Sequence, residues 1–194
     1  VDLESLMAPA ASKVLSPSLM LQPPHVRDQA LRDSNVTLYF DEVLKRDRRA
    51  YVDFIGRLRS AGLVGLKGRR IERITPFFIG RRGKDILRLL LDCRHSNMHF
   101  VPPPQSDMGL ADALVRMELE DGDELYIAQA DVLNCYYQVR IPAWLADYFG
   151  LDPLTPEESL QAGFSEAELP DSSECFPCLT VLPMGWAWSF WLFQ

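Results

Sequence analysis

Two apolar runs joined by a short turn place the strongest constraint on the fold of this chain. They span residues 74–79 and 86–92, and the turn between them, residues 80–85, contains glycines and basic residues. This pattern predicts an antiparallel β-hairpin. Alternation along the second run predicts one leucine face and one charged face: Leu87, Leu89 and Leu91 against Arg88 and Asp92.

An amphipathic helix is predicted ahead of the hairpin, over residues 41–61. Its apolar residues recur at helical spacing and leave a basic outer face. Asp41 is the expected N-cap of this helix, and Gly62 is the expected stop.

Three more elements are predicted after the hairpin. A helical pattern spans residues 107–118, and residues 125–130 are expected to form a buried strand that ends at Asp131. A short helix is predicted over residues 142–149, because a proline lies in its first turn and a glycine follows its end.

Composition suggests how the chain is organised. With 194 residues and 47% hydrophobic content, it is long enough for one domain or slightly more. Residues 1–35 are expected to be a loosely ordered approach segment, since their prolines break any long helix. Residues 36–104 hold the helix and the basic hairpin, and residues 105–194 hold the later elements. Residues 151–175 are acidic and contain prolines, which indicates a surface insertion.

Charge is segregated along the chain, although the net charge is -7. Most of the Lys and Arg residues lie between Lys45 and Arg94, whereas most of the Asp and Glu residues lie elsewhere. A basic segment of this kind can follow the phosphates of a nucleic acid while the rest of the protein stays acidic. Alternatively, it is a solvated charged helix and hairpin.

The cysteines favour a reducing compartment over a disulfide framework. Of the four, Cys93, Cys135, Cys175 and Cys178, the last two resemble half of a zinc knuckle, but no second pair follows at ligand spacing. No stretch approaches the roughly 20 apolar residues that span a bilayer, and no signal sequence opens the chain. We therefore expect an intracellular protein, and the start at Val1 and the apolar end indicate an excerpt of a longer polypeptide.

Two blocks in the C-terminal half resemble core blocks of a reverse transcriptase palm. The first is Gln129-Ala-Asp131 followed by residues 132–138, which include an aromatic pair, Tyr136 and Tyr137. Asn134 departs from the Asp that is frequent at its position. The second block follows the pattern Leu-Pro-x-Gly-(Trp/Phe)-x-x-Ser-x-x-x-Phe-Gln, and its matching residues are Leu182, Pro183, Gly185, Trp186, Ser189, Phe193 and Gln194.

The hairpin extends this resemblance upstream. Its second strand and the residues after it follow the spacing of the family's fingers block at Arg88, Asp92, Arg94 and Asn97. The chain looks closest to reverse transcriptases of retrotransposon type, over about residues 51–194 outside the acidic insertion. An aromatic-x-Asp-Asp block completes the metal site in that family, and it would follow Gln194.

The resemblance implies an α+β fold, with the fingers and partial palm of a right-hand polymerase and antiparallel strands backed by helices. It also implies an RNA-directed DNA polymerase that adds deoxynucleotides to a primer on an RNA or DNA template. Two Mg²⁺ ions would be the cofactors. The partners would be a template–primer and deoxynucleoside triphosphates, with no membrane.

By the same resemblance, Asp131 would ligate magnesium together with the backbone carbonyl of Val132, since Mg²⁺ prefers oxygen ligands. Without the neighbouring blocks, Asp131 would be expected to cap the following turn. Tyr136 would lie under the sugar of the incoming nucleotide and exclude a 2′-hydroxyl. Alternatively, Tyr136 is a core aromatic, and the two roles are compatible.

The remaining site residues are expected at the nucleotide and the template. Arg88 would clamp the triphosphate through paired donors, and Lys84, or Arg81 or Arg82, would add a phosphate contact. Met184, where retroviral enzymes often have Gln, and Gly185 would line the nucleotide pocket. Template contact or structural support is implied for four residues: Asp92, Arg94, Asn97 and Trp186.

Two other functions stay open. A decayed or domesticated remnant would bind nucleic acid through residues 45–94 and perform no chemistry. An RNA-dependent RNA polymerase is disfavoured by Tyr136 at the sugar-gate position. As an isolated chain, these 194 residues are expected to have negligible polymerase activity, because the second carboxylate block is missing.

Overall fold

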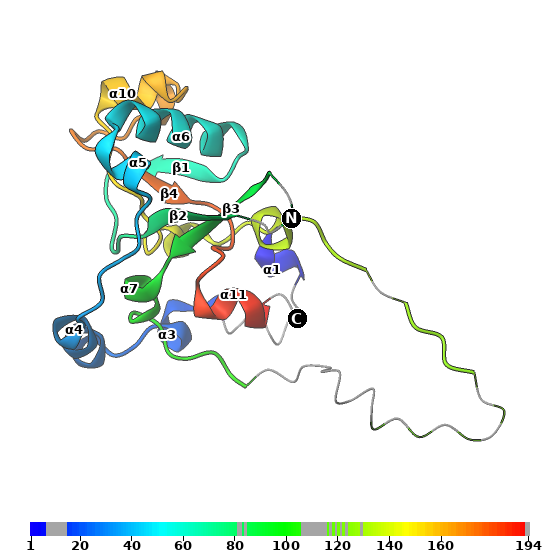
Figure 1. The fold of residues 1–194 in the computed structure, drawn as a ribbon. Coiled ribbons are helices and arrows are strands. Elements are labelled where there is room, and N and C mark those ends of the chain that lie inside the picture. Colours follow the sequence, from blue (N-terminus) through cyan, green and yellow to red (C-terminus); the bar gives the residue numbers. More distant parts are fainter. Residues whose placement is uncertain are drawn as a thin grey trace.

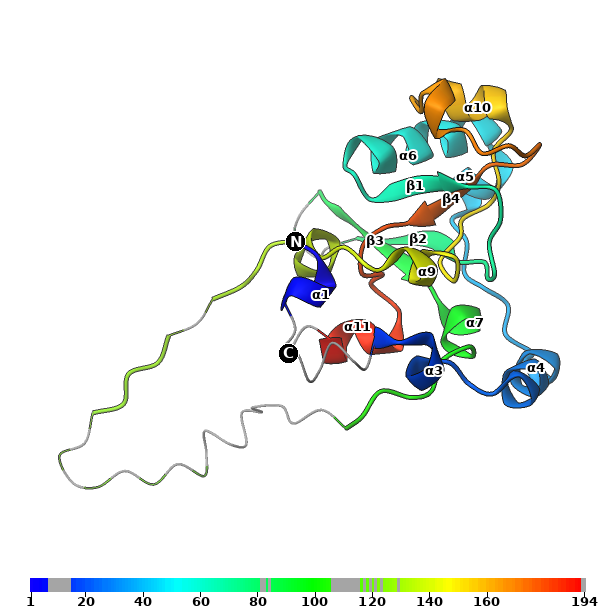
Figure 2. The same cartoon turned by 180° about the vertical axis from the view of Figure 1, so that it is seen from behind.

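The computed structural model shows a mixed fold of short helices and two small antiparallel sheets, which is compatible with the predicted α+β class. It describes residues 1–6, 15–80, 83, 85–105, 116, 118, 120, 122, 124–128 and 130–192. Helices α6 (Arg48–Ser60) and α10 (Pro156–Gln161) lie at one end of the molecule, and the sheets follow in the middle. Helices α3 (Pro17–Met20), α7 (Arg94–Asn97) and α11 (Ala187–Leu192) lie at the other end (Figures 1 and 2).

The predicted hairpin is confirmed. Strands β2 (Thr75–Gly80) and β3 (Leu87–Asp92) pair antiparallel, in a register that runs from Thr75 opposite Asp92 to Gly80 opposite Leu87. Of the turn residues between these strands, Gly83 and Asp85 are described. The basic turn residues Arg81, Arg82 and Lys84 lie outside the described residues.

A second sheet joins distant parts of the chain. Strand β1 (Val64–Lys67) pairs antiparallel with β4 (Phe176–Leu179). Strand β1 follows α6 directly, so this pairing brings the segment before the second sequence block next to that helix. Two isolated bridges, Gly150 with Cys178 and Leu154 with Cys175, attach the chain after residue 149 to β4 and to its N-terminal flank.

The single helix predicted over residues 41–61 is two helices. Helix α5 (Glu42–Arg46) ends at Asp47, and α6 begins after it. The Asp47 side chain accepts a hydrogen bond from the Ala50 amide at 3.1 Å, so Asp47 is the N-cap of α6. An Asp inside a helical run competes for backbone donors and favours such a break. The predicted start and stop are confirmed: Asp41 caps α5, and Gly62 has φ +70 after α6.

The N-terminal segment contains more regular structure than its composition predicted. Helices α1 (Leu3–Leu6), α3 and α4 (Pro24–Asp33) lie in it, and Leu15 and Met20 are buried in the core. Helices α3 and α4 each begin at a proline, which fixes φ for a first turn as well as ending a preceding helix. Residues 7–14 lie outside the described residues, and the domain boundaries stay a prediction.

The acidic segment 151–175 is not a simple surface insertion, so that prediction is wrong. It forms α10 and the 3₁₀ helix η3 (Glu166–Glu168), and α10 packs beside α6. Leu151, Leu154 and Phe164 are buried in the common core. Its apolar residues, spaced among the acidic ones, give this segment a face to bury.

The short helix predicted over residues 142–149 starts where it was expected, but it is shorter than predicted. Helix α9 spans Ala143–Ala146, and the chain then turns towards Gly150. A Cβ at Gly150 would lie 2.6 Å from the Arg70 Cβ. Glycine therefore permits the close approach of these two segments, with the Gly150 amide donating to the Glu72 carbonyl at 3.1 Å.

The buried strand predicted over residues 125–130 is wrong for its described part. Leu125, Tyr126 and Ile127 are 45%, 85% and 70% exposed, and none of the described residues there belongs to a strand. A strand depends on a paired neighbour for its backbone bonds and on side chains across the pair. No described strand lies beside this segment, so its apolar sequence alone does not form one. The helix predicted over residues 107–118 lies outside the described residues, apart from Arg116 and Glu118.

Candidate nucleotide and template site

The buried carboxylate of Asp92, at the end of β3, pairs with the half-exposed Arg94, and together they hold the chain before α5. The Asp92 side chain is 3% exposed and accepts from the Tyr39 amide at 2.8 Å and from Arg94 Nε at 2.9 Å. Arg94 also donates to the Thr37 carbonyl at 2.7 Å and stacks on the Tyr39 ring. Burial alone would raise the pKa of Asp92, but the bonds from Arg94 and Tyr39 outweigh it and lower the pKa. The roles predicted for Asp92 and Arg94 were template contact and structural support. The contacts described here give them a structural role.

Asn97 fastens the turn of the second sequence block to the end of α7. Its Nδ2 donates to the Gly185 carbonyl at 3.1 Å, and its Oδ1 accepts from the Ala187 amide at 3.0 Å. Both polar atoms of one side chain are thus used to hold this turn. Asn97 therefore supports the turn at Gly185.

Gly185 lies directly against β3. Its φ is +133, and a Cβ there would lie 2.2 Å from the Leu91 carbonyl oxygen. On the other side of the contact, the Leu91 amide donates to the Met184 carbonyl at 3.3 Å. Both the backbone angle and the available space require glycine at this position. Gly185 itself is exposed and Met184 half-buried, so both border the surface beside β3.

The first sequence block also contacts β3. Its 3₁₀ helix η2 (Cys135–Gln138) starts after Asn134, which has φ 51, a left-handed conformation that Asn tolerates well. The Tyr137 hydroxyl donates to the Leu89 carbonyl at 3.2 Å, and burial raises the pKa of Tyr137 to about 12. Tyr136 is half-buried against the core, so the core role open for it is present in the structure.

Arg88 is exposed on β3, opposite Ile79. It makes no hydrogen bond or ion pair with any other described residue, so its guanidinium is available to an external anion. Lys84, its predicted companion, lies outside the described residues.

Asp131 and Val132 are not part of this assembly. Both are exposed in irregular chain, and Asp131 bonds to none of the other residues that the structure describes. One carboxylate and one carbonyl supply at most three oxygens, whereas Mg²⁺ takes about six ligands. The described residues hold no group of three His, Cys, Asp or Glu that could bind a metal ion. By themselves, these residues do not form a magnesium site.

Trp186 belongs to the core. It is 2% exposed, and its ring centroid lies 5.2 Å from that of Phe100 and 5.3 Å from that of Phe149. A side chain so covered has no surface to offer a template. Of the two roles predicted for Trp186, template contact and structural support, the structure therefore allows structural support.

Three parts of the sequence therefore meet at β3: the hairpin with Asn97, η2 through Tyr137, and the turn at Gly185. The sequence matches no protein-family model and no curated protein. Among the described residues, no helix has the length and apolar character needed to cross a membrane. Inference about function thus rests on the contacts at β3 and on the surfaces around them.

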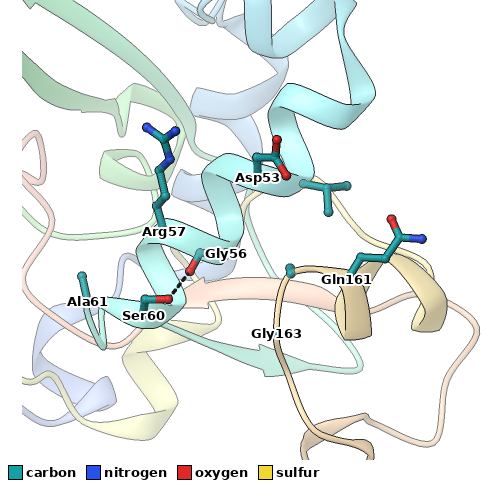
Figure 3. Close-up of a pocket in the computed structure, with 9 residues that line it drawn as sticks. Asp53, Gly56, Arg57, Ser60, Ala61, Gln161 and Gly163 are labelled. Carbon is teal, nitrogen blue, oxygen red and sulfur yellow. Dashed lines mark hydrogen bonds between the residues drawn. The ribbon is translucent and has the colours of Figure 1, made fainter.

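The sequence did not reveal a groove between α6 and the end of α10, shown in Figure 3. Its volume is about 650 Å³, and it contains none of the predicted site residues. Gly56 lines the groove, and a Cβ there would lie 3.1 Å from the Ala162 carbonyl oxygen. Several polar and small residues line it: Asp53, Arg57, Ser60, Gln161 and Gly163. Its two sides come from segments far apart in the chain, and no local pattern links them.

Most described cations of the basic segment pair with carboxylates in the fold. Carboxylates from residues 147–168 pair with six of its described cations: Arg48, Arg59, Lys67, Arg69, Arg70 and Arg73. An arginine already bonded to a carboxylate has fewer free donors for a phosphate, and the carboxylate offsets its positive charge. The described cations of the segment that have no such bond are Arg49, Arg57 and Arg88.

Proposed function

We propose that this chain is the fingers and partial palm of an RNA-directed DNA polymerase, a reverse transcriptase of retrotransposon type. The observation that supports it is the meeting of three blocks on β3, in the order and spacing of that family. Asn97 bonds to the Gly185 turn, and Tyr137 bonds to β3. These contacts join residues 88 and 48 positions apart, and such residues meet only if the fold requires it, since closing long loops has an entropic cost.

The predicted site residues that are not buried have the following roles in this proposal. Arg88 would bind the triphosphate of an incoming deoxynucleotide, because a planar guanidinium offers paired donors to phosphate oxygens. Tyr136 would select the sugar by shape, and Met184 and Gly185 would border the nucleotide pocket. Asp131, with the Val132 carbonyl, would contribute to magnesium binding in a complete enzyme, where the metal stabilises charge at the reacting phosphorus.

Primer extension by the longest natural polypeptide that contains this chain tests the proposal. Asp131→Asn is expected to abolish extension on a primed RNA template while leaving template–primer binding unchanged. Asp171→Asn is the matched control, because Asp171 is also exposed in irregular chain and forms no ion pair with a described residue. Extension by the Asp131→Asn variant at near wild-type rate would remove Asp131 from the metal site.

A remnant that binds nucleic acid without catalysis is the second candidate. The exposed and isolated position of Asp131 favours it. In the same assay, a wild-type protein that binds template–primer but never extends it would support this candidate over the first. A wild-type protein that does neither would refute both.

A further inference from the structure

We propose that the acidic segment 147–168 neutralises the basic residues on α6 and near β1, and so prevents nucleic acids and other polyanions from binding there. Polyanion contact would then be restricted to the cations that this segment leaves unpaired. This inference concerns a different surface from the nucleotide site at β3. It does not rest on catalysis.

The inner contacts of this segment lie near β1. Asp152 accepts from Arg73 Nε at 2.6 Å and from Arg73 Nη2 at 2.7 Å, and the same carboxylate lies 3.3 Å from Arg70 Nη1. Lys67 bonds to Asp147 and donates to the Ala143 carbonyl at 2.6 Å. These groups are partly buried, so they are screened less by salt than exposed pairs are.

The outer contacts bind α6 from its two ends. Arg48 holds Glu158 through two donors, with Nε 2.6 Å from Oε1, and also donates to the Pro153 carbonyl at 2.8 Å. Arg59 Nη2 lies 3.0 Å from Glu168, and its guanidinium lies 5.2 Å from the Phe164 ring centroid. Both arginines are therefore held in place, with their donors turned towards residues 153–168.

The two outer carboxylates are held by their own backbone as well as by the arginines. Glu158 accepts from the Thr155 amide at 2.8 Å in a capping box. Glu168 accepts from the Ser165 amide at 2.8 Å and from its hydroxyl at 2.7 Å. These bonds from Ser165, together with Arg59, lower the pKa of Glu168 to about 2. The carboxylates would stay charged and in place when a phosphate approached, and would repel it.

The core keeps the segment on α6. Leu154 and Phe164 are buried, and Gly56 allows α6 to approach the Ala162 backbone closely. Displacing the acidic segment would expose this apolar surface to water, which is unfavourable. The carboxylates of this segment are therefore held in place, and an approaching polyanion would not displace them.

The test compares two double variants that change the net charge equally. Glu158→Gln with Glu168→Gln removes the two carboxylates that hold Arg48 and Arg59. Glu157→Gln with Glu166→Gln is the control, because these residues are exposed in the same α10 and η3 but pair with no described arginine. Glutamine can keep the capping box, so the fold is expected to persist, with thermal melting by circular dichroism as the check.

Binding of a fluorescent single-stranded 20-nucleotide RNA is measured by anisotropy over a range of salt concentrations. With two new phosphate contacts, the Glu158/Glu168 variant should bind roughly tenfold more tightly at low salt, with a slope of log K against log salt steeper by about 1.4. The control variant should keep the wild-type slope. Equal slopes in the two double variants would overturn the proposal.

A second pair of substitutions removes the cations themselves. Adding Arg48→Gln and Arg59→Gln to the Glu158/Glu168 variant should return the slope to the wild-type value. A slope that stayed steep would place the new contacts elsewhere and overturn the proposal. If the wild-type polypeptide extends no primer but the slopes behave as expected, the reverse transcriptase proposal fails and this inference stands.

Discussion

At the scale of single residues, several positions permit only one side chain, and Gly185 is the clearest. Gly185→Ala is expected to lower the free energy of unfolding by about 2–5 kcal/mol, because the new Cβ would overlap the Leu91 carbonyl at an unfavourable backbone angle. Urea denaturation measures this loss. Gly80→Ala is the control, since a Cβ at Gly80 meets nothing within 4 Å. Equal losses in both variants would contradict the close contact at β3.

A second residue-scale prediction concerns the buried pair of His99 and Glu72. Burial would raise the pKa of Glu72, but the bond to His99 at 2.8 Å, the Arg73 amide and nearby His95 lower it below its usual 4.5. A carboxyl with a lowered folded pKa stabilises the fold above its unfolded pKa, and this is lost as pH falls through the folded value. Wild-type stability should therefore decline as pH falls below about 4.5.

Glu72→Gln tests this contribution. The variant should be less stable than wild type at pH 7 by about 1–3 kcal/mol, because a charged hydrogen bond to a buried imidazole is weakened. The difference between the two proteins should shrink as pH falls below about 4.5, when wild-type Glu72 becomes protonated as well. Asp92, Glu158 and Glu168 also have lowered pKa values, so the comparison with wild type is needed. A difference that stayed constant with pH would contradict the assignment.

At the scale of elements, the break between α5 and α6 depends on Asp47. Asp47→Ala should lower the free energy of unfolding by about 1 kcal/mol, since the Ala50 amide loses its cap. Chemical denaturation measures the loss. Asp53→Ala is the control, because Asp53 lies on the exposed face inside α6 and caps no helix. A larger loss in the Asp53 variant would show that capping is not what Asp47 contributes.

The elements also show which features a sequence can predict. The hairpin was predictable because both strands and their turn lie within a few residues of one another, and Asp41 and Gly62 carried local signals. The break at Asp47 carried a signal too, an N-cap residue inside the helical run. The strand over residues 125–130 failed because strand formation depends on a neighbour, which the local pattern does not contain.

In the candidate site, too, contacts between residues close in the sequence were predictable and contacts between distant residues were not. The resemblance implied that Asp92, Arg94 and Asn97 brace the hairpin or contact the template, and their hydrogen bonds join the end of the hairpin to the chain before α5 and to the Gly185 turn. The partners of Arg48 and Arg59 lie about a hundred residues away, and no periodicity indicates such pairs. The groove beside α6 was missed for the same reason.

At the scale of the whole molecule, the cysteines report on global unfolding. Cys93, Cys175 and Cys178 are buried, whereas Cys135 is half-buried. Burial raises the pKa of Cys178 to about 12 and that of Cys93 further, so little reactive thiolate forms on either at pH 8. A thiol reagent should therefore label Cys135 first in the native protein and all four cysteines in urea. Rapid labelling of two or more in the native state would contradict this core.

The pairing of β1 with β4 has a consequence for synthesis on the ribosome. Val64 finds its partner in Leu179, so β1 emerges roughly a hundred residues before the strand that completes its sheet. During that interval the apolar sides of β1 and α6 are without the cover that residues 151–179 later provide. The nascent chain is therefore exposed to aggregation until its C-terminal part leaves the exit tunnel, and it is expected to depend on chaperones during translation.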